Sequence, residues 1–405
     1  MPASDEHPFK VSVPDSDLEL LHKKLELATL PDELEEAHWN YGVPLARVKQ
    51  LLARWKDGFD WRKAEAEINI FPQFTRDIEV DGFGTLNIHY VHQRSNVEDS
   101  IPLLFIHGWP GHFMEAKKLI PLLTSTSPDH PTFHVVAISL PGYGFSEAPK
   151  KKGFTVAQYA EAANKLMLSL GYDQFVVQGG DWGHFVGKQM ACTYANRSVK
   201  AFHTNIAVTG FPSLLSAPLI FLTALIKPWT AAERVGIERT QSHRKYGWGY
   251  FDIQSTRPQT LGYGLADSPV GLLAWIYEKL VTWTDDYPWE DDEVLTWVSI
   301  YWFSRAGPAA SLRIYYEITQ SGDLDRIPNL WAPVPVGFSS FPKDIVVLPT
   351  LWARCMGNVV HVSEHERGGH FAAFERPEDL AGDLRNMFIT KGPAFGVVDG
   401  RTGYA

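Results

Sequence analysis

The 405-residue sequence predicts an α/β protein with a doubly wound, mostly parallel sheet, a helical N-terminal extension and a helical insertion that forms a lid. Short, continuous apolar runs at 103–106, 135–138 and 175–177 are typical of strands buried on both faces. Helical patterns separate these runs, as expected for parallel strands joined by right-handed crossovers. From 211 to about 325 helical and aromatic patterns continue without strand signals, which resume at 334–338.

The first 70 residues carry helical patterns. Ser16 and Glu19 have the spacing of a capping box, and leucines follow at helical spacing until Pro31 ends the run. A second helix is predicted from apolar side chains that recur at helical spacing, namely Leu45, Val48, Leu52 and Trp55. These helices predict an extension that precedes the sheet.

The sheet is predicted to begin near residue 74, where the apolar period changes from helical to alternating. A hairpin turned at residues 81–84 leads into an alternating strand over 86–90. Between the second and third apolar runs, Thr155 and Gln158 form a capping box that predicts a helix.

The chain closes with a further strand signal at 359–362 and a helix predicted after Pro377. A core that is interrupted by a helical insertion leaves two separate parts to build one sheet. The patterns divide the chain into a helical N-terminal extension at 1–72, the first part of the α/β core at 73–210, the helical lid at 211–325 and the second part of the core at 326–405.

Composition excludes several classes of function. The formal net charge of −10 argues against nucleic-acid binding, which requires a concentrated basic surface. Two cysteines, Cys192 and Cys355, cannot form a disulfide framework, so a reducing compartment, the cytoplasm, is expected. The longest apolar stretch, at 214–226, is shorter than the roughly 20 residues that span a bilayer, and no secretory signal opens the sequence. A soluble protein without a membrane partner is predicted.

The motif with the most chemical information is Gly-Gly-Asp-Trp-Gly at 179–183, directly after a predicted strand. Small residues two before and two after Asp181 are what a strained strand-to-helix turn requires, because side chains there would clash with neighbouring backbone. The motif therefore predicts a nucleophile elbow with Asp181 at its tip. The alternative is an aspartate that only caps the following helix.

Three further motifs lie in the chain order that such a site requires. His-Gly-Trp-Pro-Gly at 107–111 follows a strand, and the amides of Trp109 and Trp182 are predicted to form an oxyanion hole; a plain Pro-Gly turn is the alternative. His370, in Gly-Gly-His-Phe after the last strand, has the position of the base. Asp344, after the preceding strand, is placed to orient that base, although it also suits an ordinary turn.

These motifs resemble those of the microsomal-type epoxide hydrolases, in particular their soluble fungal members. The shared features are the helical N-terminal extension and the motifs His-Gly-Trp-Pro-Gly, Gly-Gly-Asp-Trp-Gly and Gly-Gly-His-Phe, and the resemblance covers nearly the whole chain. It implies an α/β-hydrolase fold in which Asp181 is the nucleophile, His370 the base and Asp344 the acid that orients the base.

The resemblance also implies two lid tyrosines that donate a proton to the epoxide oxygen. By local match these are Tyr250 and Tyr315, with Tyr316 as an alternative to Tyr315. An ionised carboxylate can attack an sp³ carbon, and a phenol with a pKa of about 10 is still protonated at neutral pH when the epoxide oxygen departs. His370 then activates water against the ester. The implied reaction yields a vicinal diol and needs neither a cofactor nor a metal.

The implied partner is a small-molecule epoxide, and the aromatic residues of the insertion favour aryl or alkyl epoxides. A homodimer is left open. Two other functions are compatible with the motifs: a haloalkane or haloacetate dehalogenase, which also uses an aspartate elbow, and a non-catalytic ligand-binding relative. The paired lid tyrosines argue against the first alternative, and the complete set of triad candidates argues against the second.

Overall fold

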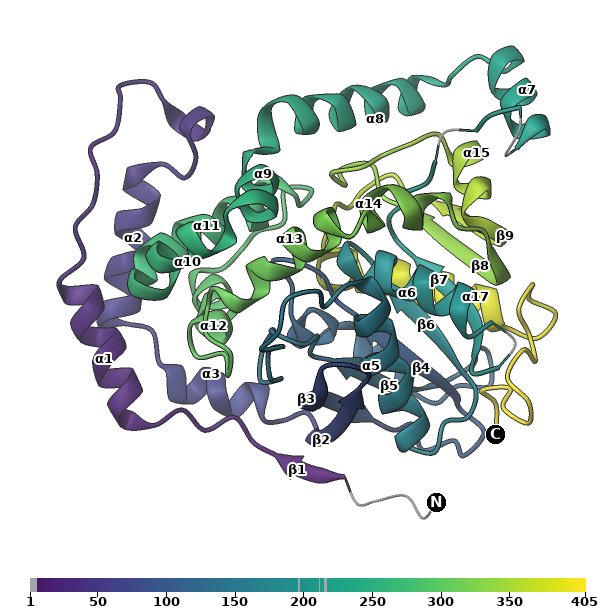
Figure 1. Ribbon diagram of the computed structural model, residues 1–405, viewed down its shortest axis with the longest axis horizontal. Coiled ribbons are helices and arrows are strands. Elements are labelled where there is room, and N and C mark those ends of the chain that lie inside the picture. The colour runs from purple at the N-terminus through teal and green to yellow at the C-terminus, as the bar shows by residue number, and fades with distance from the viewer. Residues whose placement is uncertain (1–5, 196, 211, 215–216) are drawn as a thin grey trace.

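A computed structural model describes residues 6–195, 197–210, 212–214 and 217–405. Among these residues, nine strands form one sheet in the order β1-β2-β3-β5-β4-β6-β7-β8-β9, and helices cover both of its faces (Figure 1). Strands β4 to β9 are parallel to one another, whereas β1, β2 and β3 pair antiparallel at one edge. The predicted mostly parallel, doubly wound α/β fold is confirmed.

The strands of the first half follow the predicted apolar patterns. β2 (Gln73–Val80) and β3 (Gly84–Gln93) form the predicted hairpin. β4 (Ile101–Ile106), β5 (Phe133–Ile138) and β6 (Phe175–Gly179) correspond to the three continuous apolar runs, and every residue in them is buried. Burial on both faces explains why these strands show no alternation of apolar and polar residues.

Two strands are absent from the sequence-based prediction. β1 (His7–Phe9) has only three residues, which is too short to show a period, and it joins the sheet through pairing with β2. β7 (Val199–Thr204) carries polar residues that interrupt its apolar run, although most of its side chains are buried. After the insertion, β8 (Ala332–Ser340) and β9 (Gly357–Glu364) contain the predicted strand signals.

The N-terminal helices are α1 (Asp15–Glu26), α2 (Leu45–Asp57) and α3 (Trp61–Ile68). The predicted capping box at the start of α1 is wrong, because Pro14 occupies the N-cap position and Ser16 already lies inside the helix. The Pro14 carbonyl accepts hydrogen bonds from the amides of Asp17 and Leu18, so the backbone itself begins the helix.

Helices on the two faces of the sheet build two hydrophobic cores. Leu104 and Ile106 of β4 pack in the core that contains residues of α5 (Val156–Ser169) and α6 (Trp182–Thr193). Leu103 and Phe105 point to the opposite face, in the core shared with α4 (Leu119–Thr124) and α17 (Pro377–Phe388). The predicted capping box at the start of α5 is present.

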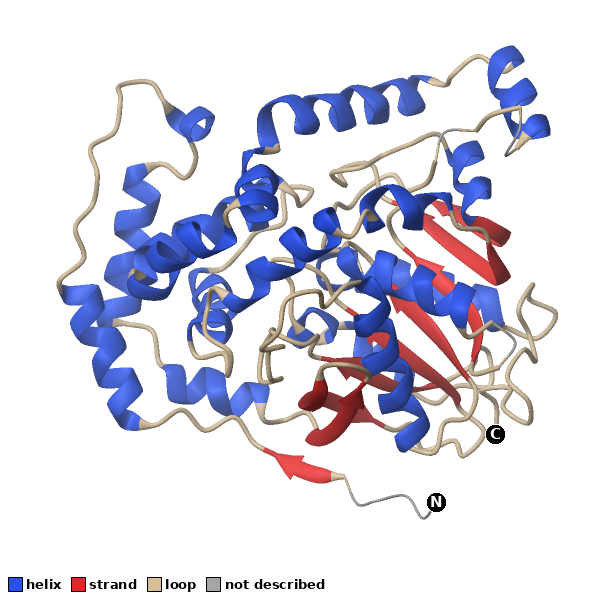
Figure 2. Ribbon diagram, viewed as in Figure 1, coloured by secondary structure: helices blue, strands red, loops and turns tan. Residues whose placement is uncertain are grey.

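Among its described residues, the chain between β7 and β8 contains helices joined by loops and no strand, and this helical segment, the lid, lies to one side of the sheet (Figure 2). Its helices are α7 (Pro218–Ile226), α8 (Ala231–Ser242), α9 (Gly249–Thr256), α10 (Pro258–Asp267), α11 (Pro269–Thr282), α12 (Asp291–Trp302), α13 (Arg313–Gln320) and α14 (Asp323–Arg326). Phe211, where the predicted lid begins, lies outside the described residues, and the domain bounds stay predictions. No helix in the described ranges is long and apolar enough to cross a membrane.

Candidate active site

The carboxyl end of β6 turns sharply into α6 at Asp181, whose backbone φ is 48° and ψ is −127°. A positive φ is uncommon for a residue other than glycine and is found at strained functional turns. The turn needs small neighbours: a Cβ atom on Gly179 would lie 2.5 Å from the Gly183 carbonyl oxygen, and one on Gly183 would lie 2.0 Å from that of Ile106. The geometry is that of a nucleophile elbow.

We expect Gly183→Ala to lower the free energy of unfolding by roughly 3 kcal/mol or more, because the added methyl group overlaps the backbone of β4. Gly264→Ala in α10 is the matched control, since no atom lies within 4 Å of its Cβ position and alanine favours a helix. Thermal unfolding compares the two variants. A Gly183→Ala protein that unfolds at the wild-type temperature would contradict the tight turn.

The loop at 107–111, which follows β4, approaches Asp181 with its backbone. The Trp109 amide donates a hydrogen bond of 2.8 Å to Asp181 Oδ1. A Cβ atom on Gly108 would lie 2.1 Å from the same oxygen, so the approach requires glycine. Trp182 is the first residue of α6, where an amide has no acceptor within the helix. Both predicted oxyanion-hole residues therefore lie next to the Asp181 carboxylate.

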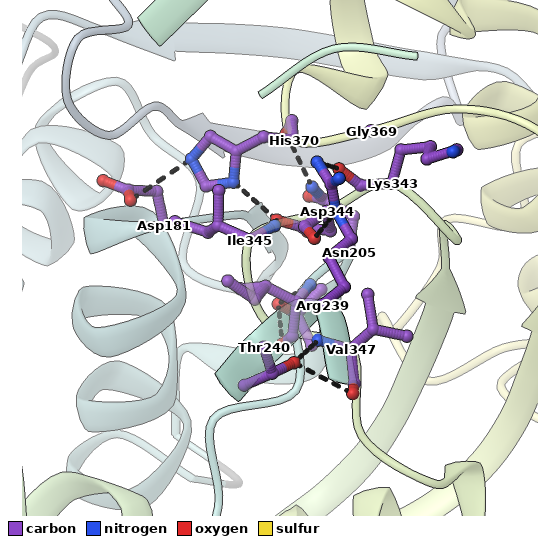
Figure 3. A network of polar contacts seen from close by, with 12 residues as sticks. Asp181, Asn205, Arg239, Thr240, Lys343, Asp344, Ile345, Val347, Gly369 and His370 are labelled. Carbon is purple, nitrogen blue, oxygen red and sulfur yellow. Dashed lines mark hydrogen bonds and ion pairs between the residues drawn. The ribbon is translucent and has the colours of Figure 1, made fainter. Parts of the chain in front are cut away.

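The structure also brings His370 and Asp344 to Asp181 (Figure 3). His370 lies between β9 and α16 (Ala372–Glu375), and Asp344 follows β8. The Nε2 atom of His370 is 3.3 Å from Asp181 Oδ2, and its Nδ1 atom is 2.7 Å from Asp344 Oδ1. His370 and Asp344 are both buried. The three residues form one continuous line of polar contacts.

The charge of His370 is set by its two neighbours. Burial alone would lower the pKa of this imidazole, but the carboxylates of Asp344 and Asp181 outweigh burial and raise the pKa to about 10. His370 is therefore protonated at neutral pH when both carboxylates face it.

Tyr250 in α9 and Tyr315 in α13 are buried against the two tryptophans of the predicted oxyanion hole. The Tyr250 ring stacks on Trp109 at a centroid distance of 5.5 Å, and the Tyr315 ring meets Trp182 edge-on at 4.7 Å. Burial is the main cause that raises the pKa of each phenol, and the Asp181 charge adds to it. Tyr316, the alternative to Tyr315, is 37% exposed.

Asp181, Trp182, Tyr250 and Tyr315 line one cavity of about 530 Å³. Its wall is otherwise mainly apolar, with contributions from Phe185, Ile206, Val208, Trp248, Phe251, Leu324, Ile345 and Val346. A mostly apolar cavity with a few converging polar groups is typical of a site for a small organic ligand.

His370 lies on a loop between β9 and α16, residues 365–371, which we call the base loop. The sequence does not predict the residues that hold this loop in place. The His370 amide donates to the lid carbonyl of Trp283 at 2.8 Å, and the Gly368 amide donates to Asp285 Oδ2 at 2.8 Å. Glu375 accepts a hydrogen bond of 2.8 Å from the Gly369 amide. The first two contacts join backbone groups to a distant segment of the lid, so no local motif signals them.

The lid also holds the loops that carry the other site residues. Trp297 and Tyr301 of α12 donate hydrogen bonds of 2.6 Å to the carbonyl oxygens of Pro110 and Gly111. Arg239 of α8 donates to the carbonyls of Lys343 and Asp344 at 2.6 and 2.8 Å. The lid thus holds two loops of the site in place, the one that carries Trp109 and the one that carries Asp344.

The fold and the elbow at Asp181 define a protein of the α/β-hydrolase class, and residues 101–223 match the family model described as the alpha/beta hydrolase fold. Residues 6–116 match the model described as the epoxide hydrolase N terminus. The chain is 37% identical over 414 residues to epoxide hydrolase 1 of Sus scrofa, which covers 95% of this chain and 89% of that protein. This chain belongs to the epoxide hydrolase family.

Two solved structures share the fold over nearly the whole chain. Aspergillus niger epoxide hydrolase is 35% identical with a TM-score of 0.81, and the match covers 94% of this chain and 95% of that chain. The juvenile hormone epoxide hydrolase of Bombyx mori is 31% identical with a TM-score of 0.85 and coverages of 94% and 93%. The family resemblance and the α/β-hydrolase fold expected from the motifs are confirmed.

Proposed function

We propose that the protein converts epoxides to vicinal diols through a covalent ester on Asp181. One observation carries the proposal. The Asp181 carboxylate, which contacts the His370 imidazole, lines the same cavity as the two protonated phenols of Tyr250 and Tyr315. These groups are a nucleophile, a base and two acids. Membership of the epoxide hydrolase family supports the choice of substrate.

The first step is ring opening. An oxygen of the Asp181 carboxylate forms a bond to one epoxide carbon while the bond between that carbon and the epoxide oxygen breaks. Tyr250 and Tyr315 protonate the departing oxygen, because their raised pKa values keep them protonated until negative charge develops beside them.

The second step is hydrolysis of the ester. Ester formation removes the charge of Asp181, which is one of the two carboxylates that raise the pKa of His370. The pKa of His370 therefore falls, and the proton it loses passes to the phenolate that ring opening left behind, so that the phenol is restored. Neutral His370 takes a proton from water, which attacks the ester carbonyl. The Trp109 and Trp182 amides hold the resulting oxyanion. Its collapse breaks the bond between the carbonyl carbon and the diol oxygen, which takes the proton back from His370, and the acid left on Asp181 then gives its proton to His370, so that both groups return to their starting states.

Isotope labelling tests this mechanism. With enzyme in excess over substrate in ¹⁸O-water, the first diol should carry no solvent oxygen, because its new oxygen comes from Asp181. Mass spectrometry of a peptide that contains Asp181 should find the label there. Labelled diol in the first turnover would show direct attack by water and would overturn the covalent mechanism.

The two phenols should each contribute to ring opening. Tyr250→Phe and Tyr315→Phe should each slow ester formation by roughly 10²-fold, and the double variant by roughly 10⁴-fold, as expected for loss of positioned acids. Tyr316→Phe is the matched control on the exposed side of α13 and should retain the wild-type rate. Stopped-flow measurement of ester formation checks the series. Loss of activity in Tyr316→Phe with full activity in Tyr315→Phe would move the assignment by one residue.

We also propose that the substrates are aryl or alkyl epoxides, which the apolar wall of the cavity supports. Diol formation from styrene oxide and from short aliphatic epoxides tests this substrate class. Halide release from chloroalkanes and cleavage of p-nitrophenyl acetate should both be absent. Halide release without diol formation would instead support a dehalogenase.

A cytoplasmic location and a homodimer are proposals as well. Cys192 and Cys355 are free thiols in the described chain, which supports a reducing compartment. The exposed side chains of Leu219, Leu222 and Leu225 on α7 form an apolar surface of the kind that marks interaction sites. Light scattering of the purified protein measures the mass and decides between monomer and dimer.

A further inference from the structure

The lid buries a lysine beside one of the two proton-donating phenols. The side chain of Lys279, on α11, is only 7% exposed, and its ammonium is paired with Glu278. Its Nζ atom lies over two aromatic rings, 4.9 Å from the centroid of Tyr250 and 5.5 Å from that of Trp275. Buried lysines are rare, so this position calls for an explanation.

The contact with Tyr250 changes in strength during the proposed reaction. A cation over an aromatic ring is attracted by the electrons of its face. When Tyr250 gives up its proton, the ring acquires negative charge and the attraction becomes that of an ion pair. A buried site strengthens such an attraction because little solvent screens it. Burial lowers the pKa of Lys279 to about 8, which leaves the ammonium mostly charged at neutral pH.

We propose that Lys279 is a positioning residue for ring opening, whose ammonium stabilises the phenolate character of Tyr250 as that phenol protonates the epoxide oxygen. The inference rests on the proposed function of Tyr250. Helix α11 contributes none of the site residues predicted from the sequence. Through Lys279 it would take part in the first chemical step.

The carboxylate of Glu278, paired with Lys279, opposes this effect. Glu278 is 27% exposed against 7% for Lys279, so solvent screens the carboxylate more than the ammonium. The contact also distinguishes the two phenols: among the described residues, no cation lies over the ring of Tyr315. Tyr250 should therefore supply the larger share of the proton donation, and Tyr250→Phe should be slower in ester formation than Tyr315→Phe.

The test is a double-mutant cycle measured on single-turnover ester formation with styrene oxide. Lys279→Met should slow ester formation by roughly ten- to thirtyfold, the range expected for loss of a desolvated cation over a ring. Hydrolysis of the ester, followed separately, should keep its wild-type rate. In a Tyr250→Phe background the same change should alter ester formation by less than about twofold, because the phenolate is gone.

Two further variants separate loss of the charge of Lys279 from loss of stability and from a general effect of removing a lysine. Glu278→Gln/Lys279→Met leaves no unpaired buried charge and should show the same slow ester formation if the single variant is unstable. Lys245→Met is the control, since Lys245 lies over the exposed ring of Tyr246, 4.7 Å from its centroid, and should have no effect. Equal slowing in both Tyr250 backgrounds, or wild-type ester formation without Lys279, overturns the proposal. Full ester formation in Tyr250→Phe alone would instead overturn the proposed role of Tyr250.

Discussion

Asp181→Ala should abolish diol formation, with a loss of roughly 10⁴-fold or more, the scale seen when a nucleophile is removed. Without the carboxylate no bond to the epoxide carbon can form, and His370 loses the contact at 3.3 Å that precedes the reaction. Steady-state diol formation under saturating substrate measures the loss, and thermal unfolding confirms that the variant is folded.

Asp252→Ala is the matched control for this experiment. Asp252 is another carboxylate that lines the cavity, but it is exposed and belongs to α9. Its removal should leave turnover close to that of the wild type. A folded Asp181→Ala protein with normal turnover would mean that Asp181 only begins α6 as a helix cap, which is the alternative that its motif leaves open.

His370→Gln should stop the reaction after ring opening and trap the ester. Attack by Asp181 needs no base, whereas the water that attacks the ester does. Turnover should fall by roughly 10⁴-fold, and intact-protein mass spectrometry should find an adduct heavier by the mass of the epoxide. Asp344→Asn should trap less ester, because a misoriented imidazole retains some basicity.

A second histidine provides the control for trapping. His361 lies on β9, contacts Ser363 and does not line the cavity that contains Asp181. His361→Gln should turn over normally and accumulate no adduct. An inactive His370→Gln protein without adduct would place the need for His370 before ring opening, and the two-step scheme would then be wrong.

The fold could be predicted where the pattern of apolar residues along the chain reflects how deeply each strand is buried. The runs that became β4, β5 and β6 are continuous because both faces of those strands are buried. β7 escaped prediction because Lys200, His203 and Thr204 break its apolar pattern. The pairing of Ser16 with Glu19 gave a false helix start, because local spacing does not reveal that Pro14 already begins the helix.

The candidate site also contains residues that the sequence predicts and residues that it does not. Asp181 and His370 stand in short motifs whose glycines allow a tight turn or a close approach of other atoms, so their positions could be predicted from the sequence. Asp344 could be placed only by its order in the chain, and it lies 2.7 Å from His370. Lys279, Asp285 and Glu375 have no local motif. Lys279 meets Tyr250 of another lid helix, and Asp285 of the lid contacts Gly368 and Glu375 of the core, so these contacts form only when distant segments pack together.

The His370 amide donates a hydrogen bond to the Trp283 carbonyl of the lid, so we expect the position of the lid to affect the proposed hydrolysis of the ester. A lid excursion wide enough to break this bond and the one between Gly368 and Asp285 displaces the base loop as well. In the proposed two-step mechanism, small epoxides that enter without such a movement should pass through both steps without accumulation of the ester. Bulky epoxides that keep the lid open should instead show an initial burst of about one equivalent per enzyme, followed by slow hydrolysis of the ester.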